Sequence, residues 1–241
     1  ALQAAAVLDH AGSLEAFSSL TSSRRSTLPV ALVGSSSRNT TWSGVRDPRI
    51  WPRTKARRSS GSGVAPDAIP FDELIEAQQP VVLEGTAGDW PLVARGREGP
   101  AAVAEYLKRF AGEHPVTAFI GPPEIAGRFH YSADLTGMNF TAERLPLANF
   151  LDTILDHLDD AAPPSLYAGS TDLDIYLPGL RDENDLPLDH PAFSFQPPLA
   201  SIWIGNRTVA AAHYDMSNNL ACCMVGRRRF TLFPPEQVEN L

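Results

Sequence analysis

The residue pair in this chain best suited to chemistry is His213 and Asp215, which lie two positions apart near the C-terminal end. Successive side chains of a β-strand point to opposite faces, so an imidazole and a carboxylate at this spacing point the same way. Together they supply two of the three ligands of the 2-His-1-carboxylate triad that binds Fe(II). The alternative is a surface histidine beside a solvated aspartate, because an isolated H-x-D pattern is common.

The residues around this pair indicate closely spaced strands. Leu199–Gly205 is an apolar run bounded by Pro198 and Asn206. Leu220–Val225 is a second run, and Phe230–Phe233 a third that ends at two prolines. Short apolar runs bounded by turn residues are typical of buried strands. The pattern therefore predicts a small β-barrel with a metal at its mouth.

The order of motifs in this region resembles that of the JmjC-type, cupin-like oxygenases. W-I-G is followed by H-Y-D and then by N-x-x-C-x-x-x-G-R-x-R-F-x-L-F-P-P-E-Q. The nearest resemblance is to bacterial cupin-like domain proteins, related to the asparaginyl hydroxylase that acts on hypoxia-inducible factor. Pro80–Gly85, Phe129–Phe140 and Ser165–Ser170 also fit this family, so the resemblance covers about residues 66–241.

The resemblance implies a mainly β fold with helices: a cupin/JmjC double-stranded β-helix, or jelly roll, with an N-terminal α/β elaboration. It also implies Fe(II) and 2-oxoglutarate as cofactors, with His213 and Asp215 on the iron. Arg228 matches the position at which many relatives bind the far carboxylate of 2-oxoglutarate with a lysine. Tyr167 matches a tyrosine that assists that carboxylate, and Asn219 a position near the iron-bound end.

Each of these assignments has a plainer alternative. Arg227, Arg228 and Arg229 can all be surface charges on a hairpin. Tyr167 can be a core tyrosine, and Asn219 a turn residue at the start of a strand. A threonine common in catalytic relatives is replaced by Ala210, with Thr208 two residues earlier.

The triad also needs a second histidine, which in the family follows H-x-D by some tens of residues. The sequence ends at Leu241, and every other histidine precedes His213. We therefore expect the final strands and the third ligand to be missing from this chain, which predicts a C-terminal truncation. Ala210, Arg228 and the missing ligand favour a second hypothesis, a non-catalytic cupin-like module that binds a ligand or a protein.

The composition indicates whether nucleic-acid binding, membrane insertion or secretion is expected. The net charge is −8, yet the stretch from Arg24 to Arg58 contains nine basic residues and one acidic residue. The rest of the chain is therefore strongly acidic. Nucleic acid is thus not the expected partner, although the basic segment leaves open a basic-armed regulator. No apolar run reaches membrane length and no secretory signal is evident. The adjacent Cys222 and Cys223 favour buried thiols in a reducing cytoplasm.

The sequence predicts two regions. Residues 1–63 read as a basic, Ser/Arg-rich, disordered leader, with a misannotated leader as the alternative, although Ala1–Ser22 has a helix-like apolar scatter. Residues 64–241 form the cupin-like domain, with helices expected at Phe71–Ala77, Pro100–Ala111 and Pro146–Leu158 and strands at Val81–Leu83 and Val116–Ile120. The family suggests a protein or peptide side chain as substrate. The oligomeric state is not fixed, and a homodimer is one expectation.

Overall fold

The protein is described here from a computed structural model, which covers residues 2–9, 30–34, 40–42, 64–77, 80–194, 198–211, 213 and 219–232. The strands are β1 (Leu2–Asp9), β2 (Val30–Gly34), β3 (Thr40–Trp42), β4 (Val81–Glu84), β5 (Val116–Gly121), β6 (Thr141–Leu145), β7 (Ser165–Asp172), β8 (Leu199–Asn206), β9 (Asn219–Val225) and β10 (Arg228–Phe230). The α-helices are α1 (Phe71–Ala77), α2 (Pro91–Glu98), α3 (Pro100–Lys108), α4 (Leu147–Asp156) and α5 (Leu173–Tyr176). Four 3₁₀ turns are η1 (Pro66–Ala68), η2 (Pro123–Ile125), η3 (Leu180–Asp182) and η4 (Pro191–Phe193).

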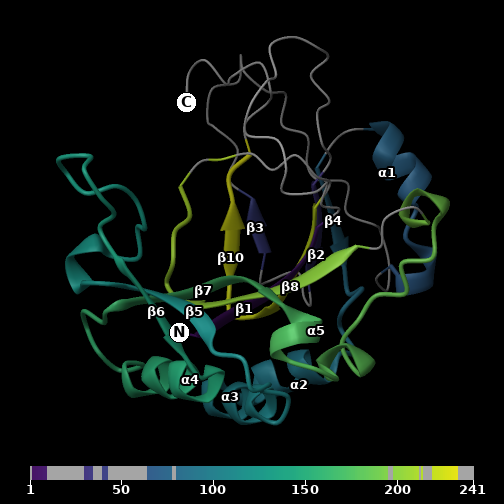
Figure 1. Cartoon of the computed structure of the whole chain (residues 1–241). Helices are drawn as coiled ribbons and strands as arrows, with labels where there is room; N and C mark the ends of the chain where they lie inside the picture. The colour runs from purple at the N-terminus through teal and green to yellow at the C-terminus, as the bar shows by residue number, and fades with distance from the viewer. Residues whose placement is uncertain are drawn as a thin grey trace.

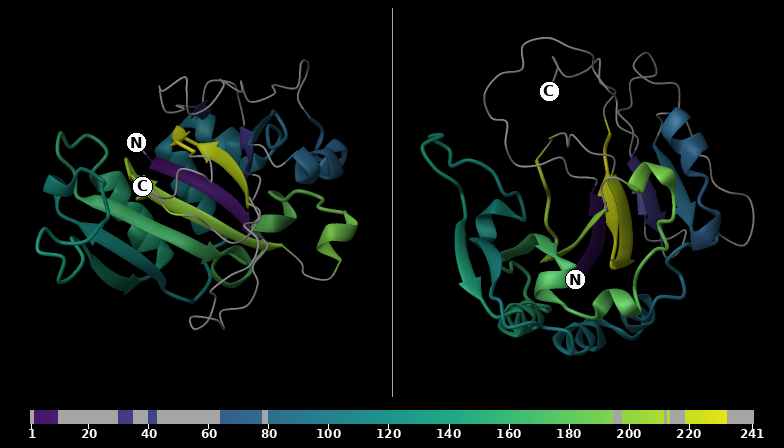
Figure 2. Two further views of the ribbon diagram at one scale, coloured as in Figure 1. Left: turned by 90° about the horizontal axis from the view of Figure 1, so that it is seen from above. Right: turned by 45° about the vertical axis from the view of Figure 1, so that its right-hand side comes forward.

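Eight strands form one sheet in the order β4-β2-β9-β1-β8-β7-β5-β6, and β10 pairs with β3 in a second, two-stranded sheet. In this spatial order, the six strands β9, β1, β8, β7, β5 and β6 are each antiparallel to their neighbours within that group. β2 is parallel to both β9 and β4. The large sheet curves, and α2, α3 and α4 lie along its outer side (Figures 1 and 2). This mixed arrangement of antiparallel sheet and helices is a jelly-roll cupin fold, as the sequence predicted.

The core lies between the sheet and these helices. Alternate residues of β8 point into it, and Ile202 and Ile204 are almost completely buried. Leu166 and Ala168 of β7 lie on the same side, because Ala168 pairs with Ile204. The amphipathic α4 covers them with Leu147, Phe150, Leu151 and Ile154. The opposite face of the sheet is therefore left to line the site.

The N-terminal segment differs from its prediction as a leader without regular structure. β1 pairs along its whole length with β8 on one side and, over residues 4–9, with β9 on the other; β2 belongs to the large sheet and β3 pairs with β10 in the small one. The Ala-rich sequence of β1 has a helix-like apolar scatter, but pairing with two neighbours outweighs local propensity. The other residues of 1–63 lie outside the described part of the chain.

A buried asparagine joins the helices to the segment that follows α5. Asn184 Oδ1 accepts a hydrogen bond from Leu92 N in the first turn of α2, at 2.9 Å. Its Nδ2 donates to the Tyr106 hydroxyl at 2.9 Å and to Leu180 O at 3.0 Å. Asn184 thus satisfies polar groups of three elements that are buried in the core.

We expect Asn184→Ala to lower the free energy of unfolding by about 2 kcal/mol, because it leaves buried donors and acceptors without partners. Denaturant unfolding measures the change. Asn149→Ala, at an exposed position of α4, is the matched control and should change the stability by less than about 0.5 kcal/mol. Equal effects of the two substitutions would show that the buried network adds nothing.

Candidate functional site

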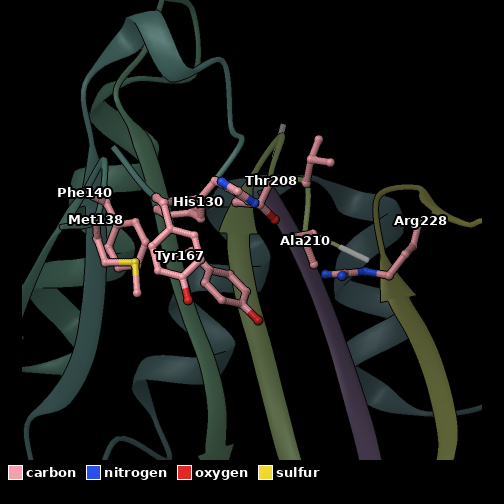
Figure 3. A pocket seen from close by; sticks show the side chains of 11 residues that line it. His130, Met138, Phe140, Tyr167, Thr208, Ala210 and Arg228 are labelled. Carbon is pink, nitrogen blue, oxygen red and sulfur yellow. The ribbon is translucent and has the colours of Figure 1, made fainter. Parts of the chain in front are cut away.

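A pocket of about 400 Å³ opens on the inner face of the curved sheet. Three stretches far apart in the sequence meet there with Tyr167 of β7. They are the hairpin formed by residues 128–140, the segment after β8 formed by residues 207–211, and the start of β10. Its lining residues are Phe129, His130, Tyr131, Met138, Phe140, Tyr167, Thr208, Val209, Ala210, Ala211 and Arg228. Figure 3 shows the hairpin side chains on one side and Thr208, Ala210 and Arg228 on the other, with Tyr167 between them.

The hairpin is held by hydrogen bonds at its base. Gly127 N donates to Ser165 Oγ at 2.8 Å, and Gly127 O accepts from Val209 N at 2.8 Å. Further along, Asn139 Nδ2 donates to Arg128 O at 2.8 Å, and Asn139 Oδ1 accepts from His130 N at 2.9 Å. These bonds connect both strands of the hairpin to each other and to the segment after β8, so two walls of the pocket are fixed relative to one another.

The segment after β8 begins at a turn that Asn206 stabilises. Asn206 is buried; its Oδ1 accepts from Leu166 N at 2.8 Å and its Nδ2 donates to Pro164 O at 2.9 Å. The next residue, Arg207, has a positive φ of 50°. The chain therefore turns sharply off the end of β8 and brings Thr208–Ala211 to the pocket.

Aromatic rings form the floor of the pocket. Phe129 contacts Phe140 and Tyr167 with ring centroids 5.2 Å and 5.7 Å apart. Tyr167 also contacts Phe119 at 6.0 Å in a stacked arrangement and Trp203 at 5.8 Å edge to face. Such ring clusters pack tightly and exclude water from the groups among them.

Tyr167 and Arg228 supply the polar chemistry of the pocket. Burial raises the pKa of the Tyr167 phenol well above its usual value, and the nearby Arg228 charge offsets only part of this effect. The hydroxyl therefore stays protonated at neutral pH and can donate a hydrogen bond. Arg228 extends from β10 with its guanidinium directed toward Ala210 (Figure 3). A protonated phenol and a guanidinium lining one pocket are suited to binding a carboxylate.

The three arginines of the G-R-R-R segment have different environments. Arg228 is half-buried and lines the pocket, whereas Arg227 and Arg229 are exposed. This alternation of exposed and half-buried side chains is expected of a strand. β10 begins at Arg228, two residues before the predicted apolar run Phe230–Phe233. The strand thus directs Arg228 alone of the three into the pocket lining.

The expected metal ligands are described only in part. His213 is exposed, and its Nδ1 lies 2.8 Å from Ala211 O. Because a carbonyl oxygen only accepts a hydrogen bond, Nδ1 is the donor, and in the neutral ring the lone pair that a metal requires is then on Nε2. Asp215 lies outside the described residues. Within the described part of the chain no cluster of three or more metal-ligating side chains occurs.

The remaining sequence-based candidates are placed as follows. Asn219 begins β9 and is half-buried, but it does not line the pocket. Ala210 does line it, and so does Thr208, two residues earlier. The stretch Phe129–Phe140 was included in the family resemblance, but no role in a pocket was predicted for its side chains, including His130. These side chains all lie in one aromatic-rich stretch, FHYSADLTGMNF, which has no strong helix or strand pattern.

Comparison with known proteins agrees with this fold. The family model described as "Cupin-like domain" matches residues 66–241. The chain belongs to the cupin-like domain family. Two relatives carry JmjC names: Jumonji C domain-containing protein 5 of Drosophila melanogaster, 25% identical over 184 residues, and JmjC domain-containing protein D of Dictyostelium discoideum, 27% identical over 184 residues.

These matches cover 73% and 70% of this chain but only 42% and 38% of the two relatives. The chain thus spans less than half the length of either relative. No solved structure gives a significant match. Among the described residues, none of the helices in this cupin-like protein is long and apolar enough to cross a membrane.

Proposed function

We propose that this cupin-like domain is part of an Fe(II)- and 2-oxoglutarate-dependent oxygenase that hydroxylates a protein or peptide side chain. The observation that carries the proposal is the convergence of Tyr167 and Arg228 on one pocket with an aromatic floor. Membership of the cupin-like family and the JmjC names of the two relatives support it. The relation to the hypoxia-factor hydroxylase belongs to this proposal as well, and so does the bacterial assignment.

Arg228 and Tyr167 would hold the far carboxylate of 2-oxoglutarate. The planar guanidinium presents parallel N–H donors that match the two oxygens of a carboxylate, and the phenol adds one O–H donor. The ring of Phe129 packs against Tyr167 and limits the access of water to the phenol, which strengthens its hydrogen bond. The role of Asn219 near the iron-bound end of the co-substrate stays a prediction, since Asn219 begins β9 outside the pocket lining.

His213 and Asp215 would hold the metal, since an imidazole and a carboxylate are ligands that Fe(II) accepts in this class. In a neutral ring with its proton on Nδ1 facing Ala211 O, Nε2 would be the ligating atom. When bound, the metal and 2-oxoglutarate supply the activation of oxygen. No residue of this sequence is assigned here as the distal histidine of the triad.

A protein or peptide substrate suits the mouth of the pocket. Tyr131, Met138 and Val209 line it and are each about half exposed, at 54%, 54% and 51%. Large apolar side chains exposed around a pocket mark a surface that another molecule covers. We also propose a cytoplasmic location, which the two free, buried thiols of Cys222 and Cys223 support.

Succinate formation tests this function. The full-length protein is incubated with 2-oxoglutarate, oxygen and Fe(II), and succinate is measured with and without a chelator. Iron-dependent succinate supports the oxygenase, and its complete lack contradicts it.

A non-catalytic ligand-binding module is the second candidate, favoured by Ala210 at a position where catalytic relatives carry a threonine. This function predicts that the pocket binds 2-oxoglutarate or a similar carboxylate without producing succinate. Calorimetric binding combined with the turnover assay therefore separates the two functions.

A further inference from the structure

Strand β7 contains an irregularity close to the pocket. Ala168 pairs with Ile204 of β8, and the next pair joins Thr171 to Ile202. β7 therefore advances three residues while β8 advances two, which is a β-bulge at Gly169 and Ser170. Ser170 has a positive φ of 51°. Bulges are frequent beside active sites, where they change the direction of a side chain.

The bulge brings Gly169 against the ring of Tyr167. A Cβ atom added at Gly169 would lie 2.3 Å from Tyr167 Oη, 2.5 Å from Cζ and 2.9 Å from Cε1. These distances are far shorter than ordinary van der Waals contacts, so the phenol occupies the space that any other residue at 169 would fill. Gly169 itself needs no unusual backbone conformation, and this space is the reason for a glycine.

Other rings confine Tyr167 from different directions. Phe119 stacks on it at an interplanar angle of 27°, and Phe129 and Trp203 contact it at 42° and 71°. Within the described part of the chain, no group forms a hydrogen bond with its hydroxyl. The phenol is thus held firmly while its polar atom keeps its capacity for a ligand.

We infer that Gly169 is a positioning residue: it allows the Tyr167 phenol to lie against β7, with its hydroxyl placed to bind the same carboxylate as Arg228. This inference rests on the proposed function, because the carboxylate is that of 2-oxoglutarate. It assigns a role to a residue that touches neither co-substrate nor metal. It also explains why a strand of the pocket is interrupted at this point.

A double-mutant cycle tests the inference. Gly169→Ala, Tyr167→Phe and the double variant are compared with the wild-type protein by calorimetric titration with 2-oxoglutarate in the presence of Fe(II) and without oxygen. We expect Gly169→Ala to raise the Kd about tenfold in the wild-type background and less than twofold when Tyr167 is already phenylalanine. The thermal unfolding midpoint of each variant is measured as well, so that a loss of folding is separated from a displacement of the phenol.

Gly137→Ala is the control for adding a methyl group to a glycine beside the pocket. No described atom lies within 4 Å of its Cβ position, so its Kd should equal that of the wild type. If Gly169→Ala weakens binding equally in both backgrounds, it does not act through the hydroxyl and the inference is wrong.

A second measurement needs neither co-substrate nor variant. In the wild-type protein, the ring protons of Tyr167 should give a nuclear Overhauser effect to the α protons of Gly169. A missing effect overturns the positioning role directly. If the effect is present but the wild-type protein does not bind 2-oxoglutarate, the failure lies with the proposed function, and the carboxylate role of both residues falls with it.

Discussion

Replacing Arg228 with glutamine is expected to raise the Kd for 2-oxoglutarate about a hundredfold. The substitution keeps much of the side-chain length but removes the charge and the forked pair of donors. A hydrogen bond to a charged group contributes about 1.5–3 kcal/mol, and 2.7 kcal/mol corresponds to about a hundredfold in affinity. Calorimetric titration of the two proteins, with Fe(II) and without oxygen, measures the difference.

Neighbouring positions provide the controls for this experiment. Arg229→Gln removes the same charge from the next residue of β10, whose side chain is exposed, and should change the Kd less than twofold. Arg228→Lys keeps the charge but loses the fork and should fall between the two. Equal losses from Arg228→Gln and Arg229→Gln would indicate a general charge effect and would remove Arg228 from the binding site.

The elements that the sequence predicted well are those whose local pattern matches their final environment. The stripe of Leu147, Phe150, Leu151 and Ile154 predicts α4 because it faces the core directly. The apolar runs in β8 and β9 predict strands because nearly every residue of both strands is buried and both are central in the sheet. β1 was not predicted as a strand because its position depends on pairing with β8 and β9 rather than on its own residues.

The pocket was predicted in part: residues in recognisable motifs were identified, and residues that reach the pocket only through tertiary contacts were not. Tyr167 and Arg228 were identified by their places in family motifs, and the structure brings both to one pocket, although their binding role remains a prediction. The hairpin side chains were missed because they reach the pocket only through tertiary contacts. The bond from Val209 N to Gly127 O, between residues 82 positions apart, has no signal in either local sequence.

This contact explains why we expect Gly127→Ala to be among the most damaging small substitutions in the domain. Gly127 has a positive φ of 83°, which an alanine adopts only with strain. A Cβ there would also lie 2.1 Å from Arg207 O and 3.1 Å from Arg207 C. Since these are backbone atoms, they cannot move aside as a flexible side chain would. We expect the free energy of unfolding to fall by about 3 kcal/mol, which denaturant unfolding measures.

The same substitution should also disturb the pocket, because relief of the contact separates the hairpin from Thr208 and Val209. The affinity for 2-oxoglutarate should therefore fall even at temperatures where the variant is fully folded. Gly137→Ala, in the same hairpin, adds an identical methyl group where no described atom lies within 4 Å, and should change neither stability nor affinity measurably. If Gly127→Ala proves as harmless as Gly137→Ala, the hairpin and the segment after β8 are not held together at this glycine. The pocket then requires another explanation for the meeting of its two walls.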